Sequence, residues 1–240
     1  MPDLERRQGL SQRLRTNLTI SEDLHGRLDL RSYPAAQELS KALAPNRAFI
    51  GVAQFGSRTQ GHAELLSDVD LVIFYDSTKL PGPKGFPNIS EFEDEVKKKA
   101  QELNEELVIW GAGIKCNLQD LGYGGWQETV DKLANSEPFE EEHEQYHDSL
   151  AYLFGQTIIG PRIDTFRERI RTRILRYPKE KQDLVVEGLA GLAVKGEGPS
   201  MYRKVVERVP EIKESELPSI ESDRQKLWEE QIRQALRLDK

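Results

Sequence analysis

The distribution of short apolar runs along the chain constrains its fold more than any other feature. Two runs of strand length, 48–56 and 69–75, lie in the first half, and a third strand-like stretch covers 107–121. Residues 126–240 carry a helical pattern almost throughout. Buried strands read as apolar runs of about 4–8 residues, whereas surface helices repeat their apolar residues about every 3.6 positions. The pattern therefore predicts an α+β protein whose sheet is built in the first half.

Helix and turn signals place the other expected elements. The chain is expected to divide near Asn135 into an α/β domain of residues 1–135 and an α-helical domain of residues 136–240. Ser90 is expected to cap a long helix in the first domain. Several helices are expected to start at a proline, because an N–H group in the first helical turn has no partner inside the helix. The expected helices are 1–17, one opened by Pro34, 90–106, one started by Ser136 and Pro138, two started by Pro161 and Pro178, 202–209 and 221–238.

Composition restricts the class of protein. Apolar residues make up 37% and charged residues 31%, and no apolar run approaches the roughly 20 residues that span a membrane. The first residues are charged and lack the apolar core of a signal peptide. Cys116 is the single cysteine, which excludes an intrachain disulfide and favours a cytoplasmic location. A formal net charge of -7 argues against nonspecific binding of nucleic acid across the whole surface.

Asp68 and Asp70 stand two residues apart at the start of the apolar run 69–75. Side chains alternate along a strand, so both carboxylates project from one face, about 6–7 Å apart at the backbone. Two convergent carboxylates favour a hard cation such as magnesium, bound together with substrate phosphates. Gly56 and Ser57 follow the preceding run, and backbone N–H groups at such a strand-to-helix turn bind phosphate oxygens. The two features together favour transfer chemistry at a nucleoside triphosphate.

The stretch GSRTQGHAELLSDVDLVI, residues 56–73, resembles the signature of the nucleotidyltransferase superfamily related to DNA polymerase beta. A small α/β domain followed by helices is also similar to stand-alone members such as the aminoglycoside nucleotidyltransferases. The resemblance implies a small mixed β-sheet, flanked by helices, in residues 1–135. The matching residues are Gly56, Ser57, Gly61, Ser67, Asp68, Asp70 and Leu71.

The resemblance also implies a role for individual residues. Asp68 and Asp70 would bind magnesium, usually two ions, which hold a nucleoside triphosphate such as ATP. Arg58 would contact phosphate or lie on the helix surface, and Lys115 would meet the triphosphate or bridge to Asp70. The implied nucleotide-binding residues are Gly56, Ser57, Arg58, Ser67 and Lys115.

The chain departs from this family at the third carboxylate, which normally lies on a neighbouring strand and helps to activate the acceptor hydroxyl. Asp120 is out of phase with the polar face of its strand unless a β-bulge turns it. That polar face carries no acid and is formed by Lys115, Asn117 and Gln119. Three acids of the helical half are alternative sources of a base: Glu141, Glu144 and Asp148.

Two further motifs compete for a function. Residues 143–147, HEQYH, match H-E-x-x-H, which on a helix places His143 and His147 on one face for zinc, with Glu144 as the base. The acid-rich surroundings favour a solvated helix start instead. Six arginines between 162 and 176 spread around a helix, which favours a solvated face, with contact to a phosphate or an acidic substrate as the alternative.

These features predict a nucleotidyltransferase that moves a nucleoside monophosphate from a triphosphate to an acceptor hydroxyl and releases pyrophosphate. The acidic chain favours a small-molecule acceptor over RNA or protein, and no membrane is expected. A catalytically degenerate nucleotide-binding module is the second hypothesis, and a zinc hydrolase built on His143 and His147 is the third. The sequence indicates neither the preferred base, nor the acceptor, nor the oligomeric state.

Overall fold

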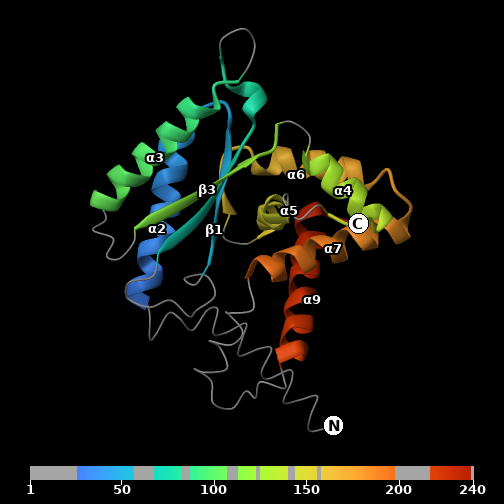
Figure 1. Cartoon of the computed structure of the whole chain (residues 1–240). Coiled ribbons are helices and arrows are strands. Elements are labelled where there is room, and N and C mark those ends of the chain that lie inside the picture. The colour runs from blue at the N-terminus through green and yellow to red at the C-terminus, as the bar shows by residue number, and fades with distance from the viewer. Residues whose placement is uncertain are drawn as a thin grey trace.

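A computed structural model of the chain shows an α+β protein (Figure 1). The structure describes residues 26–56, 68–82, 87–106, 113–122, 125–139, 144–155, 158–197 and 217–238. Within these ranges there are seven α-helices and a mixed sheet of four strands. The expected helices 1–17 and 202–209 lie outside the described residues.

The sheet has the strand order β3-β2-β1-β4. β1 pairs antiparallel with both β2 and β4, and β2 pairs parallel with β3, so the sheet is mixed as expected. The two apolar runs of the first half match β1 and β2 closely, whereas the two-residue strand β4 was not predicted. The strands are β1 (Phe49–Phe55), β2 (Val69–Tyr75), β3 (Ile114–Asp120) and β4 (Ile158–Ile159).

The helices lie on both sides of the sheet. In Figure 1, α2 and α3 lie on one side, and α4, α5, α6, α7 and α9 lie on the other. Two short 3-10 helices connect elements: η1 (Ser77–Lys79) and η4 (Tyr152–Phe154). The α-helices are α2 (Gly26–Leu43), α3 (Ile89–Glu106), α4 (Gly125–Asn135), α5 (Glu144–Ala151), α6 (Ile163–Ile174), α7 (Lys179–Glu197) and α9 (Leu217–Leu236).

Alternation along β2 divides the core into two clusters. Leu71 and Ile73 pack with α2 and α3, for example against Leu39 and Phe92. Val72 and the other side chains of the opposite face join a second cluster that runs from the sheet to α9. Since successive side chains of a strand point to opposite faces, Asp70 shares the face of Val72. The second cluster crosses the boundary expected near residue 135, and the division into two domains stays a prediction.

A close backbone contact ties the second half of the chain to the sheet. A Cβ atom on Gly160 would lie 2.3 Å from the Cα of Gly51 and 2.4 Å from the carbonyl oxygen of Ile50. Glycine at 160 therefore allows the chain after β4 to cross β1 at close range. The guanidinium of Arg162 donates to the carbonyl oxygens of Phe49, at 2.5 Å, and Asn46, at 3.2 Å.

Three expected helix starts differ from the structure. α2 begins at Gly26, so Pro34 lies inside the helix and does not open it. The cap of α3 is Asn88, which accepts a hydrogen bond from the N–H of Glu91 and donates to its carboxylate, an arrangement that satisfies the helix end without Ser90. Ser136 follows the end of α4 with a φ of 55°, and the next described helix begins at Glu144.

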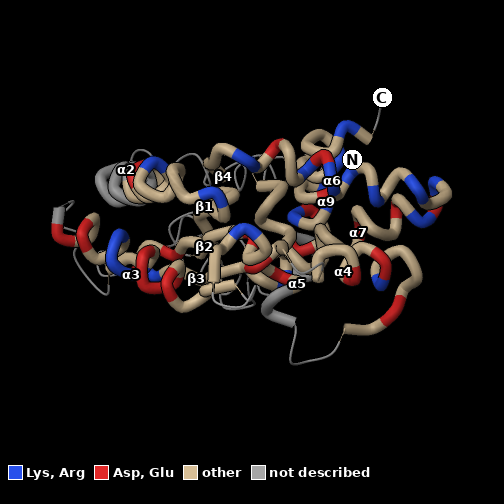
Figure 2. The backbone as a smooth tube through the Cα atoms, turned by 90° about the horizontal axis from the view of Figure 1, so that it is seen from above, with Lys and Arg blue, Asp and Glu red and all other residues tan. Residues whose placement is uncertain are grey.

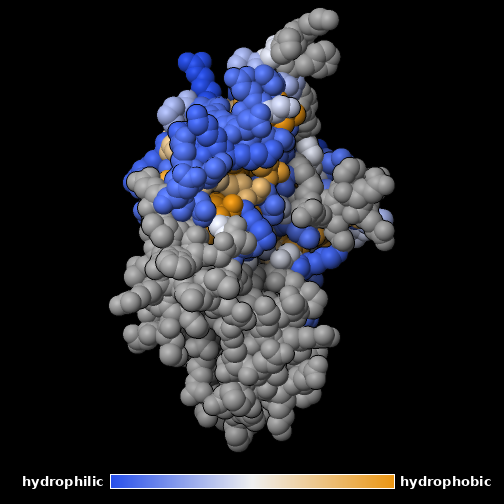
Figure 3. Space-filling view, turned by 60° about the vertical axis from the view of Figure 1, so that its left-hand side comes forward, coloured by the Kyte–Doolittle hydropathy of each residue, from blue (hydrophilic) through white to orange (hydrophobic). Residues whose placement is uncertain are grey.

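The side of the molecule formed by α3 is hydrophilic. Figure 3 shows this face with hydrophobic residues confined to a small area, and Figure 2 shows basic and acidic residues along α3. Exposed pairs such as Lys99 and Glu102, whose charged atoms are 2.8 Å apart, account for this surface. No helix in the part of the chain that the structure describes is long and apolar enough to cross a membrane.

Candidate functional site

Asp68 and Asp70 lie at the start of β2, on the face of the sheet that carries the larger helical layer. Asp70 is placed between Phe55 of β1 and Lys115 of β3 in the strand register. The side chain of Asp68, one residue before the strand, keeps 18% of its surface exposed. Val69 is buried and Asp70 is half-buried, and the projection of both acids from one face stays a prediction.

Lys115 joins the two acids. Its ammonium group forms an ion pair with the Asp68 carboxylate, and its side chain is 60% exposed. The hydrogen bond that the ammonium group donates to Asp68, the charge of Asp68 and the charge of Asp70 together raise the pKa of Lys115. The expected partner in the sequence interpretation was Asp70, which is the neighbour in register, but the long side chain reaches Asp68. Two carboxylates thus act on one cationic position.

Gly56 closes the same corner at the end of β1. Its φ of +77° lies in the left-handed region, which side chains disfavour. A Cβ atom at this position would lie 2.2 Å from Oδ2 of Asp70. Only glycine therefore permits this turn and this position of the Asp70 carboxylate together. We refer to Gly56, Asp68, Asp70 and Lys115 as the carboxylate corner. Three expected nucleotide-binding residues, Ser57, Arg58 and Ser67, lie outside the described residues.

The structure removes Asp120 as a third carboxylate at this corner. β2 and β3 pair in continuous register from Val69–Ile114 to Tyr75–Asp120, without the bulge that could turn Asp120. Asp120 is therefore about 16 Å along the strand from the position of Asp70. Its Oδ1 instead accepts hydrogen bonds from the N–H groups of Ser77, at 3.0 Å, and Gly122, at 2.8 Å, and thereby stabilises a turn.

Asp148 is an acid of the helical layer with an unusual environment. Burial raises its pKa from 3.8 to about 6. Its Oδ1 is buried and accepts no hydrogen bond from the described residues. A half-buried carboxylate with an unused oxygen is expected at sites that bind or exchange a proton. The sequence marked Asp148 only as one of three acids, because burial of a helical residue in an acidic stretch cannot be read from its neighbours.

Aromatic side chains connect Asp148 with the sheet. The rings of Phe55 and Tyr152 are 5.5 Å apart, and Phe55 is the register neighbour of Asp70. A Cβ atom on Gly196 would lie 3.0 Å from the hydroxyl of Tyr152 and 3.5 Å from Cβ of Asp148. Asp148 therefore lies near the hydroxyl of Tyr152, whose ring in turn contacts Phe55 of β1.

The H-E-x-x-H motif was interpreted as a solvated helix start, and this interpretation is wrong for His147. His147 is only 4% exposed, and its ring lies 4.1 Å from that of Phe139. The Thr129 hydroxyl lies 2.6 Å from Nδ1 of His147 and 3.0 Å from the Gly125 carbonyl oxygen, to which it donates. Because the hydroxyl has one hydrogen, Nδ1 of His147 is the donor in the other bond. His143 lies outside the described residues.

The donor set of the carboxylate corner fits magnesium with a triphosphate. Magnesium takes oxygen ligands, often one or two carboxylates with phosphate oxygens and water, which Asp68 and Asp70 can provide. Lys115 already occupies a cationic position between these acids. Groups of three or more His, Cys, Asp or Glu side chains that could hold a metal ion by themselves do not occur within the described ranges.

Comparisons with known proteins add no relative to this description. No protein-family model, no curated protein and no solved structure matches the chain.

Proposed function

We propose that the protein transfers a nucleoside monophosphate from a nucleoside triphosphate to an acceptor hydroxyl. The convergence of Asp68 and Asp70 on the Lys115 ammonium, beside the left-handed Gly56, is the observation that supports this proposal most strongly. A pair of acids that already stabilises one cation can stabilise a metal–triphosphate complex in the same place. The glycine keeps the backbone accessible to a phosphate group.

Each residue of the carboxylate corner has a defined part in this proposal. Asp68 and Asp70 would hold magnesium, which neutralises charge on the triphosphate when bound. Lys115 would leave Asp68 and donate to a phosphate oxygen, since its exposed side chain is free to turn. In the reaction the acceptor oxygen forms a bond to the α-phosphorus. The bond from that phosphorus to the bridging oxygen breaks, and pyrophosphate leaves.

The acceptor proton needs a base, and Asp148 is the acid we assign to it. A carboxylate with a pKa of about 6 is ionised at neutral pH and is a better proton acceptor than an ordinary aspartate. Asp148 lies on α5, whose Leu150 and Ala151 belong to the same core cluster as Val72 of β2. A small-molecule acceptor agrees with the net charge of -7, which disfavours a polyanionic acceptor.

The experiment incubates the protein with magnesium, each of the four labelled triphosphates and a mixture of small hydroxyl compounds. Release of pyrophosphate together with a labelled product is expected. Asp68→Asn should lower the rate at least about 100-fold, because it removes a ligand that acts on the reacting phosphates. Asp94→Asn, on the exposed side of α3, removes the same charge elsewhere and should leave the rate unchanged. Undiminished turnover in Asp68→Asn would refute the assignment.

A nucleotide-binding module without turnover is the second candidate function. Two observations favour it: Lys115 neutralises Asp68, and the polar face of β3 carries no carboxylate beside it. Calorimetry with magnesium and a triphosphate distinguishes the two functions. Binding that Asp68→Asn abolishes, without pyrophosphate release for any acceptor, would support the binding module and exclude the transferase.

A further inference from the structure

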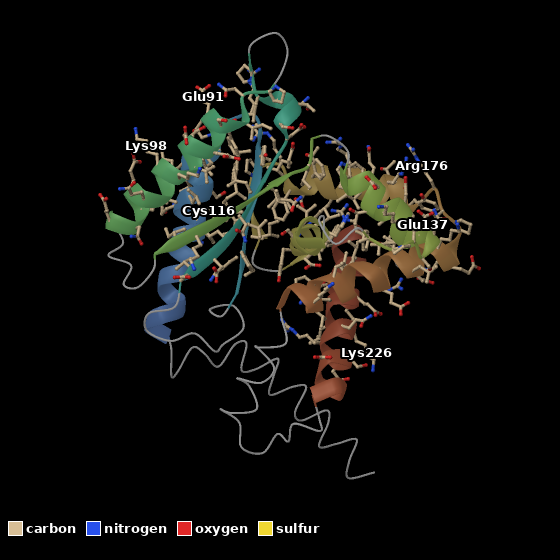
Figure 4. All side chains as sticks on the ribbon, viewed as in Figure 1. Glu91, Lys98, Cys116, Glu137, Arg176 and Lys226 are labelled. Atoms are coloured by element: carbon tan, nitrogen blue, oxygen red, sulfur yellow. The ribbon has the colours of Figure 1, made fainter. Side chains whose placement is uncertain are left out.

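A second site lies on the helical layer, between α4 and α6. The two helices pack together there and border a groove of about 610 Å³. Arg176, at one end of this groove, and Cys116, on β3, lie at well-separated places in Figure 4. Ligand-binding clefts generally measure about 300–1,000 Å³, so the groove has the size of a small-molecule site. It does not include any residue of the carboxylate corner.

The six arginines between 162 and 176, in α6 and next to its ends, differ in what they contact. Four of the six have acidic or carbonyl partners: Arg162 and Arg167 donate to backbone carbonyl oxygens, Arg171 pairs with Glu168, and Arg173 pairs with Asp131. The guanidinium groups of Arg169 and Arg176 make no ion pair or hydrogen bond within the described residues, and both side chains are exposed and line the groove. Two arginines without an acidic partner are notable in a chain whose net charge is -7.

These two arginines belong to a stripe of hydrogen-bond donors. Thr165, Arg169, Thr172 and Arg176 follow the spacing i, i+4, i+7 and i+11, which keeps them along one side of the helix and its end. The backbone positions of the two arginines are roughly 10 Å apart along the axis. Glu168 also lines the groove, but its carboxylate pairs with Arg171 at 3.0 Å.

Aromatic rings hold one of the two arginines in place. The guanidinium carbon of Arg169 lies 4.6 Å from the centre of the Phe166 ring and 5.6 Å from that of Trp126. Such contacts fix a guanidinium without neutralising its charge. Trp126, only 3% exposed, also lines the groove, and its Nε1–H donates to no acceptor within the described ranges. The groove therefore combines fixed cationic and neutral donors with few acceptors.

We propose that this groove binds a small ligand with two or more phosphate groups, and that Arg169 and Arg176 hold them. Guanidinium groups match the oxygens of phosphate in a bidentate manner, and two of them along one helix suit oxyanions spaced along a chain. The site is independent of the proposed transferase function, because it shares no residue with the carboxylate corner and needs no metal ion.

The test titrates the full-length protein with inorganic tripolyphosphate by calorimetry, in EDTA and at low ionic strength. Saturable binding with one ligand per chain is expected. Arg169→Gln/Arg176→Gln should weaken it at least tenfold. Arg47→Gln changes the charge of an exposed arginine outside the groove and should not weaken it. Asp68→Asn should leave it unchanged, which separates this site from the carboxylate corner.

Several outcomes would overturn the proposal. They are the absence of saturable binding, equal binding by the double variant, and citrate binding as tightly as tripolyphosphate. Binding of single-stranded RNA without binding of tripolyphosphate would do the same and would assign the groove to nucleic acid. If circular dichroism shows that the double variant is unfolded, Arg176→Gln gives the test, because Arg176 makes no ring contact in the described structure. A threefold or greater loss is then expected.

Discussion

The carboxylate corner and the α4–α6 groove handle charge in opposite ways. In the corner, Asp68 and Asp70 face a single cation of the same chain, Lys115, so their negative charge is partly compensated. In the groove, Arg169 rests on aromatic rings and Arg176 has no acidic partner within the described residues. A ligand of the corner must therefore displace an internal partner, whereas a ligand of the groove meets charges that are already available.

This difference indicates what each region is suited for. The ion pair of Lys115 with Asp68 stabilises the corner until a ligand such as a metal–triphosphate complex replaces it. Arg169 is held by aromatic rings before a ligand arrives, and Arg176 has no acidic partner within the described residues, so both favour binding in the absence of metal. The predictions below test the internal compensation of the corner and its contrast with other parts of the molecule, beginning with the largest expected effect.

Gly56→Ala should have the largest effect. A non-glycine residue in the left-handed region costs about 1–3 kcal/mol of stability, and the new Cβ would collide with Asp70. We expect a lower free energy of unfolding in urea and a loss of triphosphate binding, because the collision displaces one of the two acids. A variant with unchanged stability and binding would show that the corner does not depend on this turn.

Gly191→Ala is the matched control for this variant. Gly191 lies inside α7, and no other atom lies within 4 Å of the position of its Cβ. Alanine is favoured over glycine inside a helix by about 0.5–1 kcal/mol. The control should therefore unfold at a higher urea concentration than the wild type, which excludes a general intolerance of glycine replacement.

The contrast between these glycines shows how far sequence reasoning reaches. The Gly56 turn was predicted because two apolar runs, 48–56 and 69–75, bound a polar segment, and strands of the structure fall within both runs. The absence of an acid from the polar face of β3 was also predicted, because side chains alternate along a strand and Asp120 falls on the other face. β4 could not be predicted, because two residues have no period, and its pairing depends on the distant Gly51–Gly160 contact.

Asp148→Asn should change the dependence of stability on pH. Burial raises the pKa of Asp148 to about 6 in the folded state, so the folded protein holds this proton more tightly than the unfolded chain. The associated stability is complete below the ordinary pKa of 3.8 and is lost as the pH rises to about 6. The free energy of unfolding of the asparagine variant, minus that of the wild type, should therefore be larger above pH 6 than at pH 4. Urea unfolding across this range measures the effect.

Asp131 provides the opposite control. Hydrogen bonds from Arg173 and Tyr177 lower the pKa of Asp131, so its contribution is present above the unfolded pKa and is lost in acid. Asp131→Asn should destabilise the protein at neutral pH, and the difference from the wild type should shrink as the pH falls. The same pH trend in both variants would contradict the two assigned causes, namely that burial raises the pKa of Asp148 and that Arg173 and Tyr177 lower the pKa of Asp131.

Lys115→Met should have the smallest effect on stability, because the ammonium group is exposed and ion pairs in water contribute little. Its effect on ligands is more informative. Removing the internal cation should tighten the binding of magnesium alone and weaken that of a magnesium–triphosphate complex. Calorimetry measures both, and Lys97→Met, which removes an exposed lysine that pairs with Glu93, is the control. Weaker binding of magnesium alone would show that Lys115 supports the metal site instead of competing with it.

The groove shows where sequence reasoning ends. The arginines between 162 and 176 were interpreted as a solvated face, with phosphate contact as the alternative, because their spacing alone spreads them around a helix. Their separation into four paired and two unpaired residues depends on partners from other elements, such as Asp131. The same holds for Trp126, which meets Arg169 only because α4 packs on α6.

The contact between Gly51 and Gly160 makes the two halves of the chain depend on each other for folding. A strand from the second half completes the sheet of the first, and Arg162 anchors there to two carbonyl oxygens of that half. If an unrelated domain replaced either half, the backbone groups that pair β1 with β4, and the carbonyl oxygens that Arg162 contacts, would lose these partners. A chain divided near residue 135 should yield two fragments that fold only when both are present. The two halves are therefore expected to have evolved as a single unit.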